Sequence, residues 1–280
     1  MMRILLGLTA GLLLTSAAGA EEIWQTVPLP PALPTPRESG MAPVDDIQMY
    51  YAIYGEGDPV LLIHGGLGNA DEFGFQVPAL AESYEVIIAD GRGRGRSTSS
   101  DKPWSVALMA DDYLALLDHL GIDKVALVGW SDGAGIGLDI AIRHPERLSR
   151  LFAYGTAYTA AGVKTSAADT PTFKAGLAHC AADYARMSPT PAGFDAMVAR
   201  MSEMWATERD YTEDQMRGIR VPTVIFAGDH DEAIALAHSA EMAELIPGAK
   251  LVVMKDASHF GMWQKPDEFN ATVLEFLAGK

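Results

Sequence analysis

The chain has 280 residues, of which 49% are hydrophobic and 21% are charged, and its formal net charge is -16. This length can bury a large core, and no stretch has the composition of a disordered segment. The acidic balance argues against a phosphate backbone as partner, so no nucleic acid is expected. Cys180 is the only cysteine, which excludes an intramolecular disulfide.

Residues 1–20, MMRILLGLTAGLLLTSAAGA, follow the plan of a secretory signal peptide. Arg3 precedes an apolar run, and small residues at 18–20 suit cleavage after Ala20. The run is short for a membrane span, and no second run approaches that length. We therefore expect a secreted or periplasmic protein with no stable membrane insertion once the signal is cleaved.

Residues 21–43 carry prolines at 28, 30, 31, 34 and 36, and this predicts an extended, poorly packed spacer. From about Val44 onward, strand-like and helix-like patterns alternate. In chain order they are strands at 47–55 and 58–66, a helix at 71–83, a strand at 84–90, a helix at 105–121, a strand at 123–130, a helix at 133–145 and a strand at 148–155.

Residues 156–219 have a different texture, rich in Ala, Thr and Met, with an apolar stripe at helical spacing between Phe194 and Trp205. Alternation then resumes with strands at 221–229 and 249–255 and helices at 234–248 and 266–279. Such alternation predicts the α/β class, with a mostly parallel sheet flanked by helices. The core would comprise 44–155 and 220–280, and 156–219 would be an inserted helical cap.

The stretch GWSDG at 129–133 follows an expected strand and precedes an expected helix, which is the context of a Gly-x-Ser-x-Gly elbow. Such a turn lifts the hydroxyl of Ser131 above the sheet and points a helix N-terminus at it. Asp229 and Asp231 follow another strand, and His259 lies in the loop after the last one. Loops at the carboxyl ends of parallel strands gather at one edge, so these side chains could form a nucleophile, an orienting acid and a base.

Five motifs in this order resemble the α/β-hydrolase superfamily: HGG at 64–66, DGRGRGRS at 90–97, GWSDG at 129–133, GDHD at 228–231 and SHF at 258–260. The resemblance covers the chain from about Val44 to its end and implies the α/β-hydrolase fold with an inserted cap.

Carried to matching positions, the resemblance implies that Ser131 is the nucleophile and His259 the general base. It favours Asp231 over Asp229 as the acid that holds His259. The oxyanion donors would be the backbone N–H groups of Asp132 and Gly66, with Leu67 as second choice. No cofactor is implied. A metal at His230, between the two aspartates, would need further ligands that the sequence does not offer, so no metal is expected.

A serine at position 131 argues against relatives that open epoxides or displace halide with an aspartate, and it favours acyl transfer through an ester intermediate. GWSDG is also similar to the elbow of valacyclovir-hydrolase-like esterases, which act on amino-acid esters. Asp132 could then attract a cationic amine, or it could simply favour the helix start. We expect Trp130 and Leu67 to contact the substrate.

The remaining motifs have structural interpretations. DGRGRGRS lacks the final glycine of a dinucleotide-binding loop, so Asp90, Arg92 and Ser97 are interpreted as a network that stabilises a turn. His64 is expected to support the oxyanion loop by hydrogen bonds.

The sequence thus predicts a secreted serine hydrolase that cleaves small or medium carboxylic esters. The alternatives that use the same triad are an amidase or iminopeptidase and a lactonase. A cofactor-free haloperoxidase side activity is also compatible with these residues. From a different class, a non-catalytic small-molecule binding module stays open too. The sequence does not indicate an oligomeric state.

Overall fold

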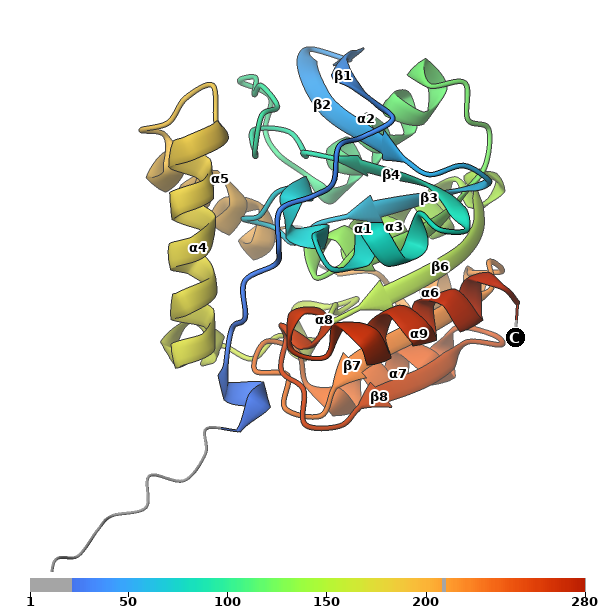
Figure 1. The fold of residues 1–280 in the computed structure, drawn as a ribbon. Coiled ribbons are helices and arrows are strands. Elements are labelled where there is room, and N and C mark those ends of the chain that lie inside the picture. Colours follow the sequence, from blue (N-terminus) through green and yellow to red (C-terminus); the bar gives the residue numbers. More distant parts are fainter. Residues whose placement is uncertain (1–21, 208–209, 280) are drawn as a thin grey trace, which may run out of the picture.

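An eight-stranded sheet forms the centre of the computed structural model, which describes residues 22–207 and 210–279 (Figure 1). The expected signal at 1–20 lies outside these residues. The strand order is β1-β2-β4-β3-β5-β6-β7-β8. The strands are β1 (Glu38–Val44), β2 (Ile47–Tyr54), β3 (Asp58–Ile63), β4 (Tyr84–Ala89), β5 (Val125–Trp130), β6 (Leu148–Tyr154), β7 (Thr223–Gly228) and β8 (Lys250–Met254). Only the pairs β1–β2 and β2–β4 are antiparallel, which confirms the expected mostly parallel sheet.

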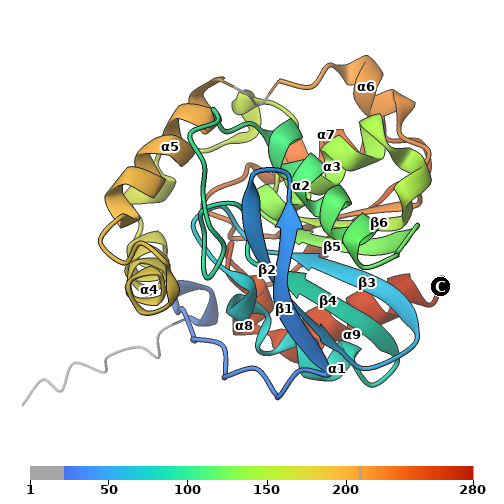
Figure 2. The ribbon, with the colours of Figure 1, turned by 90° about the horizontal axis from the view of Figure 1, so that it is seen from above.

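Helices cover both faces of the sheet, because successive side chains of a buried strand point to opposite sides. In β3, Leu61 and Ile63 face one apolar cluster, and Val60 and Leu62 face the other. The first cluster includes α2 (Val106–His119), α3 (Asp132–Arg143), α6 (Glu213–Gly218) and α7 (Leu236–Leu245), and the second includes α1 (Gln76–Leu80), α8 (Gly261–Gln264) and α9 (Pro266–Leu277). Figure 2 shows these two sets on opposite sides of the strands.

Two more helices, α4 (Pro171–Met187) and α5 (Phe194–Thr207), stand at the end of the sheet toward which the parallel strands run (Figure 1). The side chain of Thr170 accepts the N–H of Phe173 and so caps α4. In α5, Met197, Met201 and Met204 are buried at helical spacing. The described part of 156–219 holds these helices, α6 and short 3-10 turns, but no strand.

The expected spacer at 21–43 includes part of the sheet and a few contacts with the core. β1 begins inside it, at Glu38, and pairs along its whole length with β2. Val27 and Leu33 pack against the second apolar cluster, and Gln264 Nε2 donates a 2.7 Å hydrogen bond to the carbonyl of Thr26. Residues 26–36 run extended, as expected, and none of residues 22–40 is buried; the difference from the expectation is that β1 begins before residue 43.

In the two described ranges, no helix combines the length and the hydropathy needed to cross a bilayer.

Candidate active site

Ser131 lies in the turn between β5 and α3 with φ 56° and ψ -118°, a conformation that a serine rarely adopts. Its N–H donates to the carbonyl of Tyr154 at 2.8 Å, and its carbonyl accepts the N–H of Ala134 at 3.0 Å. A Cβ at Gly129 or Gly133 would overlap the backbone of neighbouring residues. The two glycines therefore permit a turn tight enough to hold Ser131 in a strained, protruding position.

His259 pairs with one of the two candidate acids. Its Nδ1 atom lies 3.0 Å from Oδ2 of Asp231, and both side chains are buried. Oδ1 of Asp231 also accepts the N–H groups of Ala233 and Ile234, each at 2.8 Å, which fixes the carboxylate. Asp229 instead accepts the N–H of Ala257 at 3.3 Å. Asp231 is thus the carboxylate that can orient the imidazole.

Ser131 and His259 both lie against the end of β6. Ser131 bonds to Tyr154, and His259 Cε1 lies 3.0 Å from the point where a Cβ at Gly155 would stand. Trp130, the residue before Ser131, donates from Nε1 to the carbonyl of His259 at 2.9 Å. Within the described residues the Ser131 hydroxyl makes no hydrogen bond. Catalytic hydrogen bonds are often long in ligand-free enzymes and shorten when substrate binds.

The electrostatic surroundings of His259 favour its protonated form. Burial alone lowers the pKa of the imidazole, but the carboxylates of Asp231, Glu232 and Asp132 outweigh burial and raise the pKa above its ordinary value of 6.5. An imidazole held in this way takes a proton readily from a neighbouring hydroxyl.

Two further residues hold this pair, and the sequence motifs did not reveal them. Oε2 of Glu232 accepts the backbone N–H of His259 at 2.9 Å, and Oε1 accepts the hydroxyl of Thr172 in α4. Lys164 Nζ donates to the carbonyl of Asp231 at 2.6 Å. Residues 156–219 therefore contact Asp231 directly through Lys164 and contact the His259 loop through Glu232. The one feature of the sequence that could have indicated this is the additional acid, Glu232, directly after GDHD.

The loop after β3 lies beside Ser131, since a Cβ at Gly65 would stand 3.6 Å from the Cβ of Ser131. His64 supports this loop as expected. Its Nε2 accepts the N–H of Gly91 at 3.0 Å, and its Nδ1 lies 2.6 Å from the carbonyl of Gly65. Burial, together with the charge of Arg94, lowers the pKa of His64 to about 3, so the ring is neutral and donates from Nδ1.

Gly66 and Asp132, the expected oxyanion residues, lie close together. A Cβ at Gly66 would overlap the Asp132 carboxylate and stand 2.8 Å from the Trp205 ring. Asp132 is the first residue of α3, and its Oδ2 accepts Trp205 Nε1 at 2.7 Å. The carboxylate thus connects the core to α5 of the cap.

Trp130 and Leu67 occupy different surroundings. Trp130 is buried and packs edge-to-face against Phe260 and Trp263, so its indole supports the loop that carries His259. The substrate contact that we expected for Trp130 stays a prediction. Leu67 is half-buried and packs against the first apolar cluster, to which Met201 of α5 belongs.

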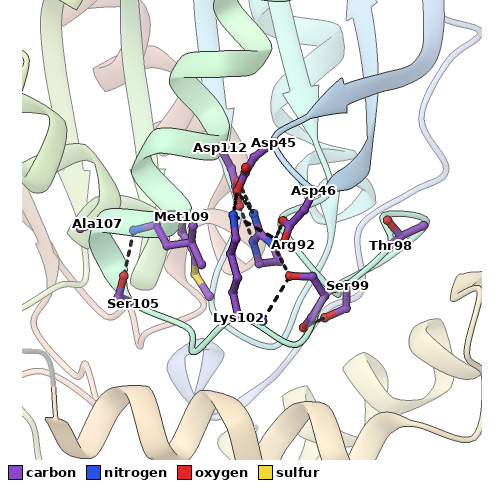
Figure 3. A network of polar contacts seen from close by, with 12 residues as sticks. Asp45, Asp46, Arg92, Thr98, Ser99, Lys102, Ser105, Ala107, Met109 and Asp112 are labelled. Carbon is purple, nitrogen blue, oxygen red and sulfur yellow. Dashed lines mark hydrogen bonds and ion pairs between the residues drawn. The ribbon is translucent and has the colours of Figure 1, made fainter.

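DGRGRGRS forms a network that stabilises a turn. Arg92 donates from Nε and Nη2 to Asp112 at 2.8 and 2.6 Å, and Figure 3 shows Asp112 and the acids of the β1–β2 turn, Asp45 and Asp46, grouped around it. Asp90 accepts the N–H of Ala70 at 2.8 Å, and Ser97 donates to the carbonyl of Asp90 at 2.6 Å. These groups are occupied by protein partners, which supports the structural interpretation over phosphate binding.

Asp229 and His230 lie near Asp256, with ligand-type atoms within 4.8 Å of one another. The sequence did not indicate Asp256 as a neighbour. These groups are exposed or half-buried, and the ring of Trp24 stacks on His230 at 4.2 Å. We assign this loop cluster no ligand.

Comparison with known proteins is consistent with this geometry. Residues 58–188 and 163–266 match the family model described as alpha/beta hydrolase fold. The chain is 28% identical over 264 residues to the protein named "Putative carbamate hydrolase RutD" of Caulobacter sp. strain K31, covering 83% of this chain and 96% of the relative. It is 28% identical to 3-oxoadipate enol-lactonase 2 of Acinetobacter baylyi, and the match covers 81% of this chain and 92% of the relative. The crystal structure of the enol-lactonase from Burkholderia xenovorans LB400 superimposes with a TM-score of 0.69 at 26% identity, over 85% of this chain and 100% of that one.

Proposed function

The chain belongs to the alpha/beta hydrolase fold family, and on this premise we propose that it is a serine hydrolase that cleaves carboxylic esters through an acyl-enzyme. The observation that carries the proposal is the strained turn at Ser131 beside a buried His259–Asp231 pair, both against the end of β6. A displayed hydroxyl next to an oriented base is the arrangement that nucleophilic acyl transfer requires.

In the proposed reaction, Ser131 Oγ attacks the substrate carbonyl while His259 Nε2 takes its proton. Asp231 holds Nδ1–H, fixes the tautomer and stabilises the imidazolium. His259 then returns the proton to the leaving alcohol, and water releases the acid from the ester of Ser131 in a second half-reaction.

The negative charge that forms on the carbonyl oxygen would be held by the N–H groups of Gly66 and Asp132, with Leu67 as the alternative to Gly66. Each such donor contributes roughly 3 kcal/mol to the transition state. The start of α3 adds its positive end at the same point. Every step uses side chains and backbone groups of this chain.

A lactonase is the second candidate, because a lactone is a cyclic ester and two of the relatives are named enol-lactonases. Cleavage of a carbamate, suggested by the name of another relative, or of an amide would use the same three residues. A non-catalytic binding module would need the fold but not the triad.

An ester, lactone, carbamate and amide panel run on the wild type beside Ser131→Ala tests the proposal. We expect ester hydrolysis that falls by about 10³-fold or more in Ser131→Ala, with an unchanged melting temperature. A fluorophosphonate should label the wild type at Ser131. Folded protein that neither turns over any substrate nor takes the label would favour the binding module.

We also propose that the protein is exported, on the pattern of residues 1–20 alone. Fractionation of expressing bacterial cells, with mass determination of the mature N-terminus, tests this. Full-length protein retained in the cytoplasm would contradict it.

A further inference from the structure

Arg94 is a buried cation next to the proposed reaction centre. Its side chain is 2% exposed, and its Nη1 atom lies 3.4 Å from the carbonyl of Gly66. No carboxylate among the described residues lies within ion-pair distance of it; Asp132, Asp112 and Asp90 act on it only from farther away. Its other contacts are the sulfurs of Met109 and Met201, at 3.5 and 3.1 Å. Buried charges normally have close, oppositely charged partners, so this one is unusual.

Unsatisfied donors gather around this guanidinium. Arg94 Nε is buried without a hydrogen-bond partner, and so is Nε1 of Trp104, whose ring lies 5.7 Å from the Arg94 guanidinium carbon. Sulfur is a weak acceptor, so the two Nη groups are poorly satisfied as well. Buried donors without acceptors are destabilising, which makes the cluster a candidate for ligand binding.

A cavity of about 480 Å³ lies between the 101–104 loop and α5 and shares Trp104 with this cluster, although Arg94 does not line it. Met204 and the acids Asp101 and Glu203 also line it. Arg200 also lines it, but Arg200 donates to the Ser99 hydroxyl and the carbonyls of Ser100 and Lys102, so its donors are occupied. Among the cations here, Arg94 is the one whose donors lack strong acceptors.

We propose that Arg94, together with Trp104 Nε1, binds a free carboxylate carried by the substrate, so that the preferred substrates are esters or lactones with a second, ionised carboxyl group. This inference rests on the proposed function and names its substrate class. A carboxylate offers only acceptors and fits the planar guanidinium with two parallel hydrogen bonds. Met201 comes from the cap and is flexible enough to yield its place.

The position of Arg94 also determines how far the carboxylate of the substrate lies from the carbonyl that reacts. Its guanidinium contacts the carbonyl of Gly66, whose N–H is a proposed oxyanion donor. The bound carboxylate and the reacting carbonyl would therefore lie on opposite sides of one residue of the loop. We expect a short spacer of a few carbon atoms between them.

Matched pairs of substrates test the inference. Monoethyl succinate, glutarate and adipate carry the carboxylate, and their neutral amide analogues, such as ethyl glutaramate, have nearly the same shape. Ethanol release is measured for all of them. In the wild type we expect kcat/KM to favour the anionic member of the best pair by about 10-fold or more, as a charge-assisted hydrogen bond allows. In Arg94→Met this ratio should fall to about 1, mainly through KM, and Arg94→Lys should keep part of it.

Arg217→Met is the matched control, because it removes an equal charge from an exposed helix and should leave the ratio unchanged. Ser131-dependent hydrolysis of both members at equal efficiency in the wild type would overturn the inference and leave the proposed function standing. Equal losses on both substrates in folded Arg94→Met would also overturn it, since Arg94 would then only support the loop. If Arg94→Met does not fold, the wild-type ratio and Arg94→Lys decide. Failure to hydrolyse any ester, with no fluorophosphonate label, would instead refute the proposed function.

Discussion

The backbone N–H of His259 donates a 2.9 Å hydrogen bond to Oε2 of Glu232, the residue that follows the proposed triad acid, Asp231. The other oxygen of Glu232 accepts the hydroxyl of Thr172 at the start of α4. One carboxylate thus fixes the loop of the proposed base and contacts the cap. It also places a negative charge beside the imidazole, in addition to that of Asp231.

Glu232→Gln should move the pH dependence of activity. His259 must be neutral to take a proton, and its pKa is raised above 6.5, so activity should fall as the pH drops through that raised value. Glutamine keeps an acceptor for the N–H but removes the charge, so the acidic limb of kcat/KM should move to lower pH, by roughly 0.5 to 1 unit. The charged neighbours that stay are Asp231, Asp132 and Lys164.

Thr172→Val serves as the control for Glu232→Gln, because it removes the cap contact and keeps the charge. In Thr172→Val the acidic limb of kcat/KM should stay at the same pH as in the wild type. If the acidic limb does not shift in Glu232→Gln, or shifts equally in both variants, the charge of Glu232 does not act on His259.

Asp231→Asn and Asp229→Asn should separate the two candidate acids. Asp231 contacts His259 Nδ1, so its loss should lower kcat by roughly 10³ to 10⁴-fold through loss of the correct tautomer. Asp229 contacts the Ala257 N–H and the side chains of Lys255 and His230 but not His259, so Asp229→Asn should stay within about 2-fold of the wild type. Steady-state kinetics on one ester decide the matter, and similar losses in both variants would contradict the assignment.

Asp132→Asn tests whether the elbow carboxylate selects amines. Because Asp132 accepts Trp205 Nε1 and so anchors α5, we expect no preference for an amino-acyl ester over its neutral isostere. The ratio of kcat/KM for the two should stay the same in Asp132→Asn, even if both values fall. A wild-type preference for the amino ester that disappears in Asp132→Asn would instead establish amine recognition.

Glu72→Gln should make stability less sensitive to pH. Glu72 is 1% exposed, its Oε2 has no hydrogen-bond partner, and the Cys180 thiol lies 3.7 Å from its Oε1. Burial raises the pKa of Glu72 well above 4.5, so the wild type loses stability as the pH rises from the unfolded-state pKa through the folded-state value.

Glutamine has no proton to lose, so Glu72→Gln should melt roughly 2 to 6 °C higher than the wild type at pH 8, with a smaller difference at pH 5. Scanning calorimetry at both pH values measures this. Glu56→Gln, at an exposed position, is the control. A variant that melts lower than the wild type at pH 8 would show that Glu72 is held as a stabilising anion.

The sequence by itself determined the parts of this protein that depend on local patterns. A Gly-x-Ser-x-Gly turn is defined by five consecutive residues, and the backbone overlap that larger residues would cause at Gly129 and Gly133 explains why both positions are glycine. The strand and helix alternation likewise follows from the periods of apolar residues, so the parallel sheet could be predicted. The preference for Asp231 over Asp229 came from the resemblance to the α/β-hydrolase superfamily, and the sequence alone left both acids open.

Only the tertiary structure decided which distant residues meet. Glu232 reaches Thr172 across 60 positions of the chain, and Arg94 reaches Met201 across 107, so no local pattern records either contact. The contacts of Val27 and Leu33 with the second apolar cluster, and the hydrogen bond from Trp130 to the His259 carbonyl, could not be predicted for the same reason. Periodicity tells which face of an element is apolar, but packing against other elements determines its neighbours, and in this protein those neighbours set the charge and the support around the proposed triad.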